Sequence, residues 1–291
     1  MFPDEASCFR YLERMRWPGG FVCWAAYLMA TQTPGVPAME LQKKLGITRY
    51  ETAFQLLHRL RAVMVHPSRD KIGAEWPLEL DIVFVCGKHK SGIQGKMDKA
   101  PVIIAVEIRR REVRDSKTDK VIKRALAGRM RLQKLPDKSA ASVDEFAKDC
   151  LAPGAVIVSD NGTEFTNLLD LGYDHRPVPM RGDRAKIDSC LPMISRVTAN
   201  LKTWIDGTFH GVRKQHLQAY LNEFMFRFNR RFHRSMSFLT LLGLGTLHAG
   251  LTYREVYGVA HRENPNKSLS CVATGYAGKN LSKATWRELT A

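Results

Sequence analysis

Apolar side chains in the first quarter of the chain recur at helical spacing. Residues 40–45 form a short amphipathic stretch, and a turn beginning at Gly46 follows it. From residue 49 to residue 64, apolar positions return every three or four residues, which predicts a second helix. Thr48 stands before this helix with an acidic residue three positions later, which is the pattern of a capping box. We therefore expect a helix-turn-helix at about residues 38–65.

From Trp76 onward the pattern changes to short β-branched runs. These runs predict strands at 78–85, 101–109, 124–135, 155–159 and 175–179. Helices are predicted at 141–149 (capped by Ser139), 163–170, 193–205 and 215–234. Three consecutive strands followed by alternating helices and strands indicate an α/β domain with a mixed sheet flanked by helices.

These patterns divide the chain into three parts. We expect an all-α N-terminal region at 1–70, the α/β domain at 75–235, and a C-terminal helix with a tail at 236–291. Beyond about Tyr257 the sequence is polar and aperiodic, which predicts a weakly ordered tail.

Charge indicates the kind of partner. The 291 residues include 45 Lys and Arg against 29 Asp and Glu, a net charge of +16. Such a protein usually meets a polyanion, and nucleic acid is favoured over an anionic membrane surface. We expect no membrane association, because no apolar run approaches the ~18 residues of a span and the first residues lack a signal-peptide core. The six cysteines are scattered without a CxxC pair, which favours a reducing cytosolic setting over a disulfide scaffold or a zinc site.

Two carboxylates stand out within the predicted sheet. Asp81 lies in the middle of the first strand, and Asp160 ends the fourth, just before Asn161 and Gly162. In a mixed sheet these strands can lie side by side, so both carboxylates would reach one sheet edge. Two carboxylates beside a positive surface suit a Mg²⁺ site acting on phosphodiesters. Alternatively, Asp81 is an edge-strand charge and Asp160 a turn residue, a reading that the pairing of the two residues weakens.

The arrangement resembles the RNase-H-like core of the DDE transposase and integrase superfamily. Residues 160–165, Asp-Asn-Gly-Thr-Glu-Phe, are similar to the second-Asp motif of retroviral-type integrases. More closely, the chain resembles bacterial insertion-sequence transposases that combine an N-terminal zinc ribbon, a helix-turn-helix and an RNase-H-like catalytic domain. The similar segments are Cys8 with Arg16-Trp17-Pro18, the helix-turn-helix at 41–61, and residues 79–81, 201–210 and 216–231. The resemblance covers about residues 6–257.

The resemblance also implies ligands that this chain lacks. It places a third metal ligand on a helix, seven residues before a lysine that Lys202 matches. The third position is therefore Ser195, a neutral hydroxyl and a poor Mg²⁺ ligand. Glu164 and Asp188 stay open as replacements for the missing carboxylate. No zinc is expected, because the paired CxxC motifs of the ribbon are missing and a structural zinc site needs four ligands.

DNA contacts are expected from two helices and one lysine. The candidates are Arg49, Tyr50, His58, Arg59 and Arg61 on the second helix of the helix-turn-helix, Arg227, Arg230 and Arg231 on the late helix, and Lys202. The alternative for the first group is a plain αα-hairpin with a solvated basic face. Lys202 could likewise be an ordinary solvated lysine, and the late helix a core helix with a charged face.

Two functions follow. The first is a transposase that binds double-stranded DNA at terminal inverted repeats, cleaves it with Mg²⁺ or Mn²⁺, and joins the 3′-OH to target DNA. Asp81, Asp160, Ser195 and Lys202 would form its catalytic set, with Asp81 and Asp160 as metal ligands. We expect it to act as a homo-oligomer on DNA, associated with the nucleoid in the bacterial cytoplasm. The alternative is a non-enzymatic DNA-binding protein or repressor derived from a decayed transposase.

Overall fold

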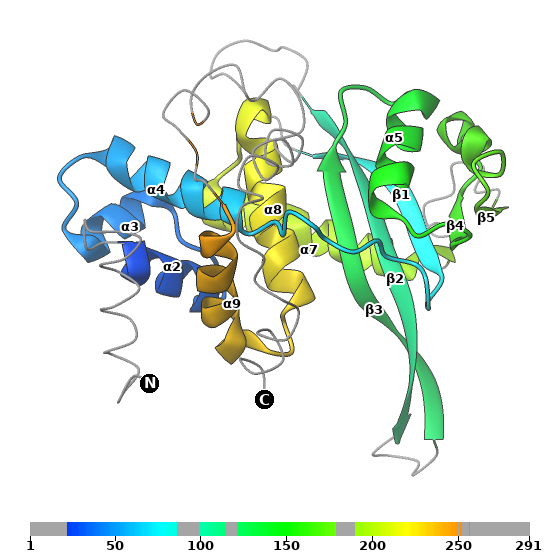
Figure 1. Cartoon of the computed structure of the whole chain (residues 1–291), viewed down its shortest axis with the longest axis horizontal. Helices are drawn as coiled ribbons and strands as arrows, with labels where there is room; N and C mark the ends of the chain where they lie inside the picture. Colours follow the sequence, from blue (N-terminus) through cyan, green and yellow to red (C-terminus); the bar gives the residue numbers. More distant parts are fainter. Residues whose placement is uncertain are drawn as a thin grey trace, which may run out of the picture.

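A five-stranded mixed sheet organises the chain, as the sequence predicts (Figure 1). The computed structural model describes residues 22–85, 99–114, 121–178 and 190–248, with residues 251 and 256. The strands are β1 (Leu78–Val85), β2 (Ala100–Arg114), β3 (Val121–Lys134), β4 (Val156–Asp160) and β5 (Asp174–Val178), in the spatial order β3-β2-β1-β4-β5. The predicted tail beyond residue 257 lies outside the described residues.

The directions and register of the strands determine which residues of neighbouring strands lie next to each other. β1, β2 and β3 form an antiparallel meander, whereas β1 pairs in parallel with β4, and β4 with β5. The β1–β4 ladder runs from Leu78 opposite Ile157 to Leu80 opposite Ser159. β2 and β3 continue beyond the other strands as a two-stranded ribbon, after a register shift between Val106 and Ile108 (Figure 1).

Helices cover both faces of the sheet. α7 (Pro192–Phe209) and α8 (Leu217–Asn229) pack on the face that carries Val102, Ile104 and Met130. α5 (Ala140–Cys150) and the 3₁₀ helix η1 (Thr163–Leu168) pack on the opposite face. The predicted cap of α5 is confirmed, because Ser139 Oγ accepts a hydrogen bond from the Ser142 N–H at 3.3 Å. Residue alternation along each strand thus supplies two separate apolar layers.

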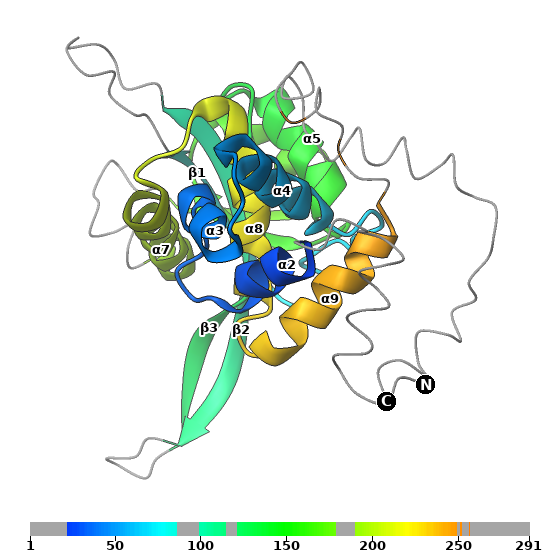
Figure 2. The same ribbon diagram turned by 90° about the vertical axis from the view of Figure 1, so that its left-hand side faces the viewer.

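A second, helical core lies beside the sheet (Figures 1 and 2). It comprises α2 (Val22–Thr31), α3 (Ala38–Leu45), α4 (Tyr50–Val63) and α9 (Arg234–Thr246), with α9 packed against α2. Gly46 ends α3 at a φ of 63°, a left-handed conformation that glycine adopts without strain. The predicted capping role of Thr48 is wrong: Arg49 occupies the N-cap position of α4, and no side chain there caps the helix.

The predicted helix at 215–234 is shorter in the structure, and the C-terminal helix expected from residue 236 is present as α9. A short 3₁₀ helix, η2 (Lys214–His216), precedes α8, which ends at Asn229, and α9 begins at Arg234. The two helices pack differently, since α8 packs on the sheet and reaches the helical core through Phe226, whereas Phe238, Leu241 and Leu242 of α9 pack in the helical core.

α8 also covers the open edge of β3. Asn229 binds both backbone polar groups of Met130, accepting from its N–H at 2.9 Å and donating to its carbonyl at 3.2 Å. Gln218 accepts from the Lys134 N–H at 2.8 Å. A buried sheet edge needs such partners, because an unpaired backbone N–H or carbonyl away from water is costly. None of the helices in the described ranges is long and apolar enough to cross a membrane.

Candidate active site

Asp81 and Asp160 lie at the same level on neighbouring parallel strands. The β1–β4 ladder ends at Leu80 and Ser159, and these two aspartates are the next residues of the two strands. Asp81 shares its sheet face with Val83, and Asp160 with Val158, and both valines pack against the α7 and α8 layer. The sequence-based expectation that the two strands lie side by side is therefore confirmed.

Asp160 is close enough to Asp81 for its charge to affect the ionisation of Asp81. Burial raises the pKa of Asp81 to about 6, and the negative charge of Asp160 adds to the rise. Burial also raises the pKa of Asp160, as does the charge of Glu164, whereas a hydrogen bond from the Gly162 N–H opposes the shift. Concentrated negative charge that is partly buried is the electrostatic signature of a cation site.

Glu164 is a third carboxylate near this pair. Its side chain is buried and folds back over Gly162, where a Cβ atom would come within 2.7–2.8 Å of the three carboxyl atoms. Lys138, from the β3–α5 connection, places Nζ 2.6 Å from Glu164 Oε1. The hydrogen bond to Glu164 and the charges of Glu164, Asp160 and Asp81 raise the pKa of Lys138. One ammonium therefore interacts with all three carboxylates.

His175 supports the Asp160 strand from β5. Its Nε2 lies 2.7 Å from Ser159 Oγ, and that hydroxyl donates to the Asp160 carbonyl at 2.7 Å. Burial lowers the pKa of His175, although the charge of Asp160 opposes the shift. A neutral imidazole that donates through Nε2 to the hydroxyl fits both contacts.

Glu79 brings α7 to the same sheet face. It stands two residues before Asp81 on β1, so both side chains point to one face. Glu79 Oε2 accepts hydrogen bonds from the Met193 and Ile194 N–H groups, each at 2.8 Å, at the N-terminus of α7. The next residue is Ser195, which is half-buried, and Lys202 is exposed two turns further along. The first turn of α7 thus carries Ser195 over the strand that carries Asp81.

The residues present partly fit a divalent metal. Mg²⁺ binds oxygen ligands, keeps several waters, and is commonly held by one or two carboxylates plus substrate phosphates, so Asp81 and Asp160 suit it. In the part of the chain that the structure describes, no group of three or more His, Cys, Asp or Glu side chains is arranged to hold a metal. Asp188, a possible replacement ligand, lies outside the described residues.

The predicted DNA-binding residues of α4 divide into two groups. Arg49, Tyr50 and Arg59 are exposed. His58 and Arg61 are 1% exposed, so the expectation that they face DNA is wrong for this structure. Helical spacing alone could not separate the two groups, because the buried face of α4 is chosen by its packing against α8.

Arg61 and His58 are buried for different reasons. Arg61 Nε donates to Glu223 Oε2 of α8 at 2.8 Å, and its guanidinium lies 3.9 Å from the Tyr220 ring centroid. His58 packs among aromatic rings, with centroids 4.2 Å from Phe54 and 5.0 Å from His216. Both side chains therefore join the helical unit, which consists of α2, α3, α4 and α9, to the sheet domain.

The arginines predicted on the late helix also make internal contacts, and only Arg227 lies within α8, because Arg230 and Arg231 follow its end. Arg227 donates to Glu223 at 3.3 Å and to the carbonyls of Gln32 and Thr33, just past the end of α2. Arg231 donates to the Ala127 carbonyl, and Arg230 lies 4.1 Å from the Phe226 ring centroid. The three phenylalanines at 224, 226 and 228 pack inside. These arginines therefore do not form a continuous basic surface along the late helix.

The β2–β3 ribbon carries a basic surface that the sequence reasoning did not single out. Arg109, Arg110, Arg111 and Arg124 are exposed there. The run of three arginines at 109–111 was the available signal. These arginines form an exposed surface because the ribbon extends beyond the sheet (Figure 1). The pattern of residues along a strand does not reveal such an extension.

The mixed sheet, the level pair of aspartates and the crossing helix α7 define an RNase-H-like transposase domain. The family model described as the ISXO2-like transposase domain matches residues 79–229, just over half of the chain. The chain therefore belongs to this family of insertion-sequence transposases. The match runs from Glu79 in β1 to Asn229 at the end of α8 and includes Asp81, Asp160 and Ser195.

A second family model, a transposase zinc-ribbon domain, matches residues 3–24. That segment contains Cys8 and Cys23 and no histidine, which is half of the four ligands of a structural zinc site. The expectation of no zinc stays a prediction. No curated protein and no solved structure matches the chain.

Proposed function

We propose that this chain binds the terminal inverted repeats of an insertion sequence and cleaves and joins DNA strands with Mg²⁺ or Mn²⁺. The observation that carries the proposal is the level pair of carboxylates, Asp81 and Asp160, on adjacent parallel strands. Such a protein would act as a homo-oligomer on DNA, at the nucleoid in the bacterial cytoplasm.

Asp81 and Asp160 would hold the metal through their carboxylate oxygens. When bound, the divalent ion supplies activation of the attacking oxygen and stabilisation of the leaving one. Ser195, on the first turn of α7, would contribute a neutral hydroxyl beside the pair. Lys202, exposed on the same helix, would contact a DNA phosphate near the scissile bond.

Glu164 is the described carboxylate best placed to compensate for Ser195. Its approach over Gly162 directs the carboxylate toward the loop that follows Asp160. The ion pair with Lys138 holds this buried carboxylate in place. Glu164 would therefore restore negative charge at the site, as a third oxygen ligand or through a water bound to the metal.

The exposed half of α4 would contact the DNA ends. Arg49, Tyr50 and Arg59 stay exposed, whereas His58 and Arg61 are buried. Recognition helices read bases mainly with residues near their N-termini, and Arg49 and Tyr50 lie at that end of α4.

A strand-nicking assay tests the enzymatic part. The purified chain is incubated with a terminal-repeat duplex and Mg²⁺ or Mn²⁺, and nicked strands are measured. We expect cleavage in both metals, its loss in Asp160→Ala, and no loss in Asp170→Ala, a control that removes an exposed aspartate just after η1. Cleavage that persists in Asp160→Ala would contradict the proposed role of Asp160.

A second candidate is a DNA-binding protein or repressor without cleavage activity. The neutral Ser195 at the third ligand position favours it, and so does a zinc-ribbon match that holds two cysteines. Specific binding of the terminal-repeat duplex without nicking in either metal would select this candidate.

A further inference from the structure

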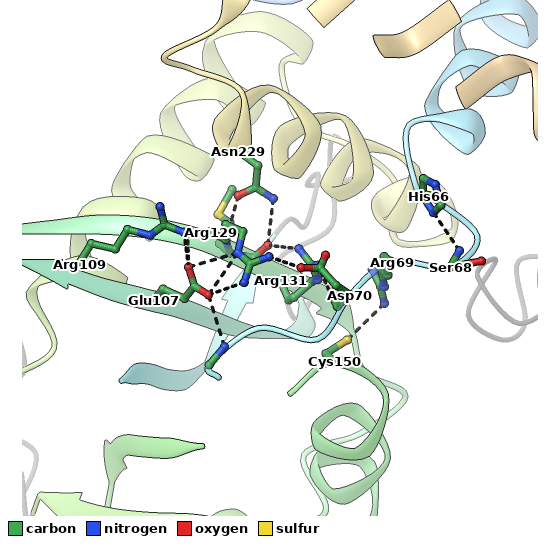
Figure 3. A network of polar contacts seen from close by, with 12 residues as sticks. His66, Ser68, Arg69, Asp70, Glu107, Arg109, Arg129, Arg131, Cys150 and Asn229 are labelled. Atoms are coloured by element: carbon green, nitrogen blue, oxygen red, sulfur yellow. Dashed lines mark hydrogen bonds and ion pairs between the residues drawn. The ribbon is translucent and has the colours of Figure 1, made fainter. Parts of the chain in front are cut away.

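A cavity with several charged residues in its walls lies where the helical unit meets the edge of the sheet. Its volume is about 500 Å³, and its walls are the segment 64–70 after α4, strand β3 and helix α8. Figure 3 shows the polar residues around it, with Asn229 of α8 on one side of β3 and Arg69 and Asp70 of the connecting segment on another. β3 is two strands away from β1, so this cavity is separate from Asp81 and Asp160.

Four arginines line the cavity against one carboxylate. The arginines are Arg69, Arg129, Arg131 and Arg230, and the carboxylate is Asp70. Arg129 is balanced from outside the cavity by the buried Glu107, whose carboxylate lies 3.0 Å from Arg129 Nη2, and it also pairs with Asp70 (Figure 3). Asp70 also forms an ion pair with Arg131, whose Nη2 lies 3.5 Å from Asp70 Oδ1. The cavity retains an excess of positive charge.

Three guanidinium groups have little or no negative charge beside them. Within the described ranges, Arg69 and Arg230 form no ion pair; Arg69 donates to Cys150 Sγ at 3.2 Å, and Arg230 packs on a phenylalanine ring. Arg131 is 7% exposed, and its Nε has no hydrogen-bond partner in the described part of the chain. Burial and the neighbouring charge of Arg69 lower the pKa of Arg131.

Burying a charge without a counter-charge is costly, so this arrangement would be stabilised by an anion. Guanidinium groups bind phosphate with particular strength, because their N–H groups match its oxygens two at a time. We propose that the cavity binds a phosphate group between Arg69, Arg131 and Arg230.

Two sources of phosphate share this chemistry. The first is the backbone of duplex DNA, in which case this inference rests on the proposed DNA binding of the chain. DNA seated there would bridge the segment that follows α4 and the edge of the sheet. The second source is a free phosphate compound, which would need no DNA.

The first arm of the test measures thermal unfolding of the full chain while inorganic phosphate replaces chloride at constant ionic strength. We expect a saturable rise in Tm for the wild type. The rise should disappear in the double variant Arg69→Gln, Arg230→Gln and persist in Arg213→Gln, a control that removes an exposed arginine elsewhere. The Arg69→Lys, Arg230→Lys pair, which keeps both charges, provides a second variant if the glutamines impair folding; it should weaken the response.

The second arm measures the affinity for a terminal-repeat duplex as a function of salt. Each lost phosphate contact should reduce the slope of log K against log salt by about 0.9. A reduced slope in the double variant identifies the DNA backbone as the source, whether or not the strand is cleaved. An unchanged slope with a saturable phosphate response identifies a free phosphate compound. Equal phosphate responses in the wild type and the double variant, together with equal slopes, would overturn the proposal.

Discussion

The ion pair between Arg61 and Glu223 provides the sharpest test of how the helical unit is attached to the transposase domain. Arg61 belongs to α4 and Glu223 to α8, and their side chains are 1% and 0% exposed. Glu223 also accepts from Arg227, so one carboxylate compensates two guanidinium groups. Replacing Glu223 by glutamine keeps the shape of the side chain and one acceptor oxygen but removes the charge. Two buried cations would then face each other without compensation.

The expected cost is large. Removing one partner of a buried pair typically costs about 3–5 kcal/mol. Because glutamine still accepts a hydrogen bond, we expect Glu223→Gln to lower the free energy of unfolding by about 3 kcal/mol, the lower end of that range. For a chain of this size that corresponds to a fall in Tm of about 5 °C. Equilibrium denaturation in urea, followed by circular dichroism, measures the free energy directly.

A matched control makes the same chemical change at an exposed pair. Glu40 lies 2.7 Å from Lys44 on α3, with both side chains about two-fifths exposed. We expect Glu40→Gln to cost about 0.3–0.5 kcal/mol. Replacing Arg61 and Glu223 together, as Arg61→Met with Glu223→Leu, should recover part of the loss, since apolar side chains of similar volume often substitute well for such a pair, while Arg227 still loses its carboxylate partner. A loss below about 1 kcal/mol in Glu223→Gln, similar to that of Glu40→Gln, would refute the argument.

Three further predictions concern the sheet and the carboxylate site. Burial raises the pKa of Glu107, but the hydrogen bonds and charge of Arg129 outweigh it and hold the pKa below its ordinary value of 4.5. The stability that Glu107 contributes is therefore present above pH 4.5 and is lost as the pH falls below this value. Glu107→Gln should make the free energy of unfolding fall less steeply on acidification. An equally steep fall in the variant would contradict this. Asn229→Ala should cost about 1–3 kcal/mol in urea denaturation, because it leaves a backbone N–H and a carbonyl of β3 unsatisfied, and a cost near zero would show that water replaces the amide. Gly162→Ala should displace the Glu164 carboxylate, because the new methyl group would come within 2.8 Å of it. Calorimetric titration with Mn²⁺ should then show weaker binding than in the wild type, and unchanged affinity would exclude Glu164 from the site.

Local patterns were sufficient for much of the fold. Each of the five strands was predicted near its observed position, because β-branched runs bounded by turn residues depend on neighbours in the chain. The side-by-side placement of Asp81 and Asp160 followed as well, since a three-stranded meander leaves few positions for the fourth strand. The late helix was predicted to run to residue 234, beyond its observed end at Asn229, because Phe232 continues the apolar spacing from Phe228 although it is exposed in the structure.

The sequence by itself determined the mixed sheet, the level pair of carboxylates and the family resemblance, because these depend on residue type and on spacing along the chain. Tertiary structure alone decided which arginine side chains remain exposed and could contact DNA. Arg49 and Arg59 are exposed on α4, whereas Arg61 on the same helix is buried against Glu223, a residue 162 positions away. The fate of a charged side chain depends on the surface that packs against its helix. That surface comes from distant parts of the chain, and no local pattern records it.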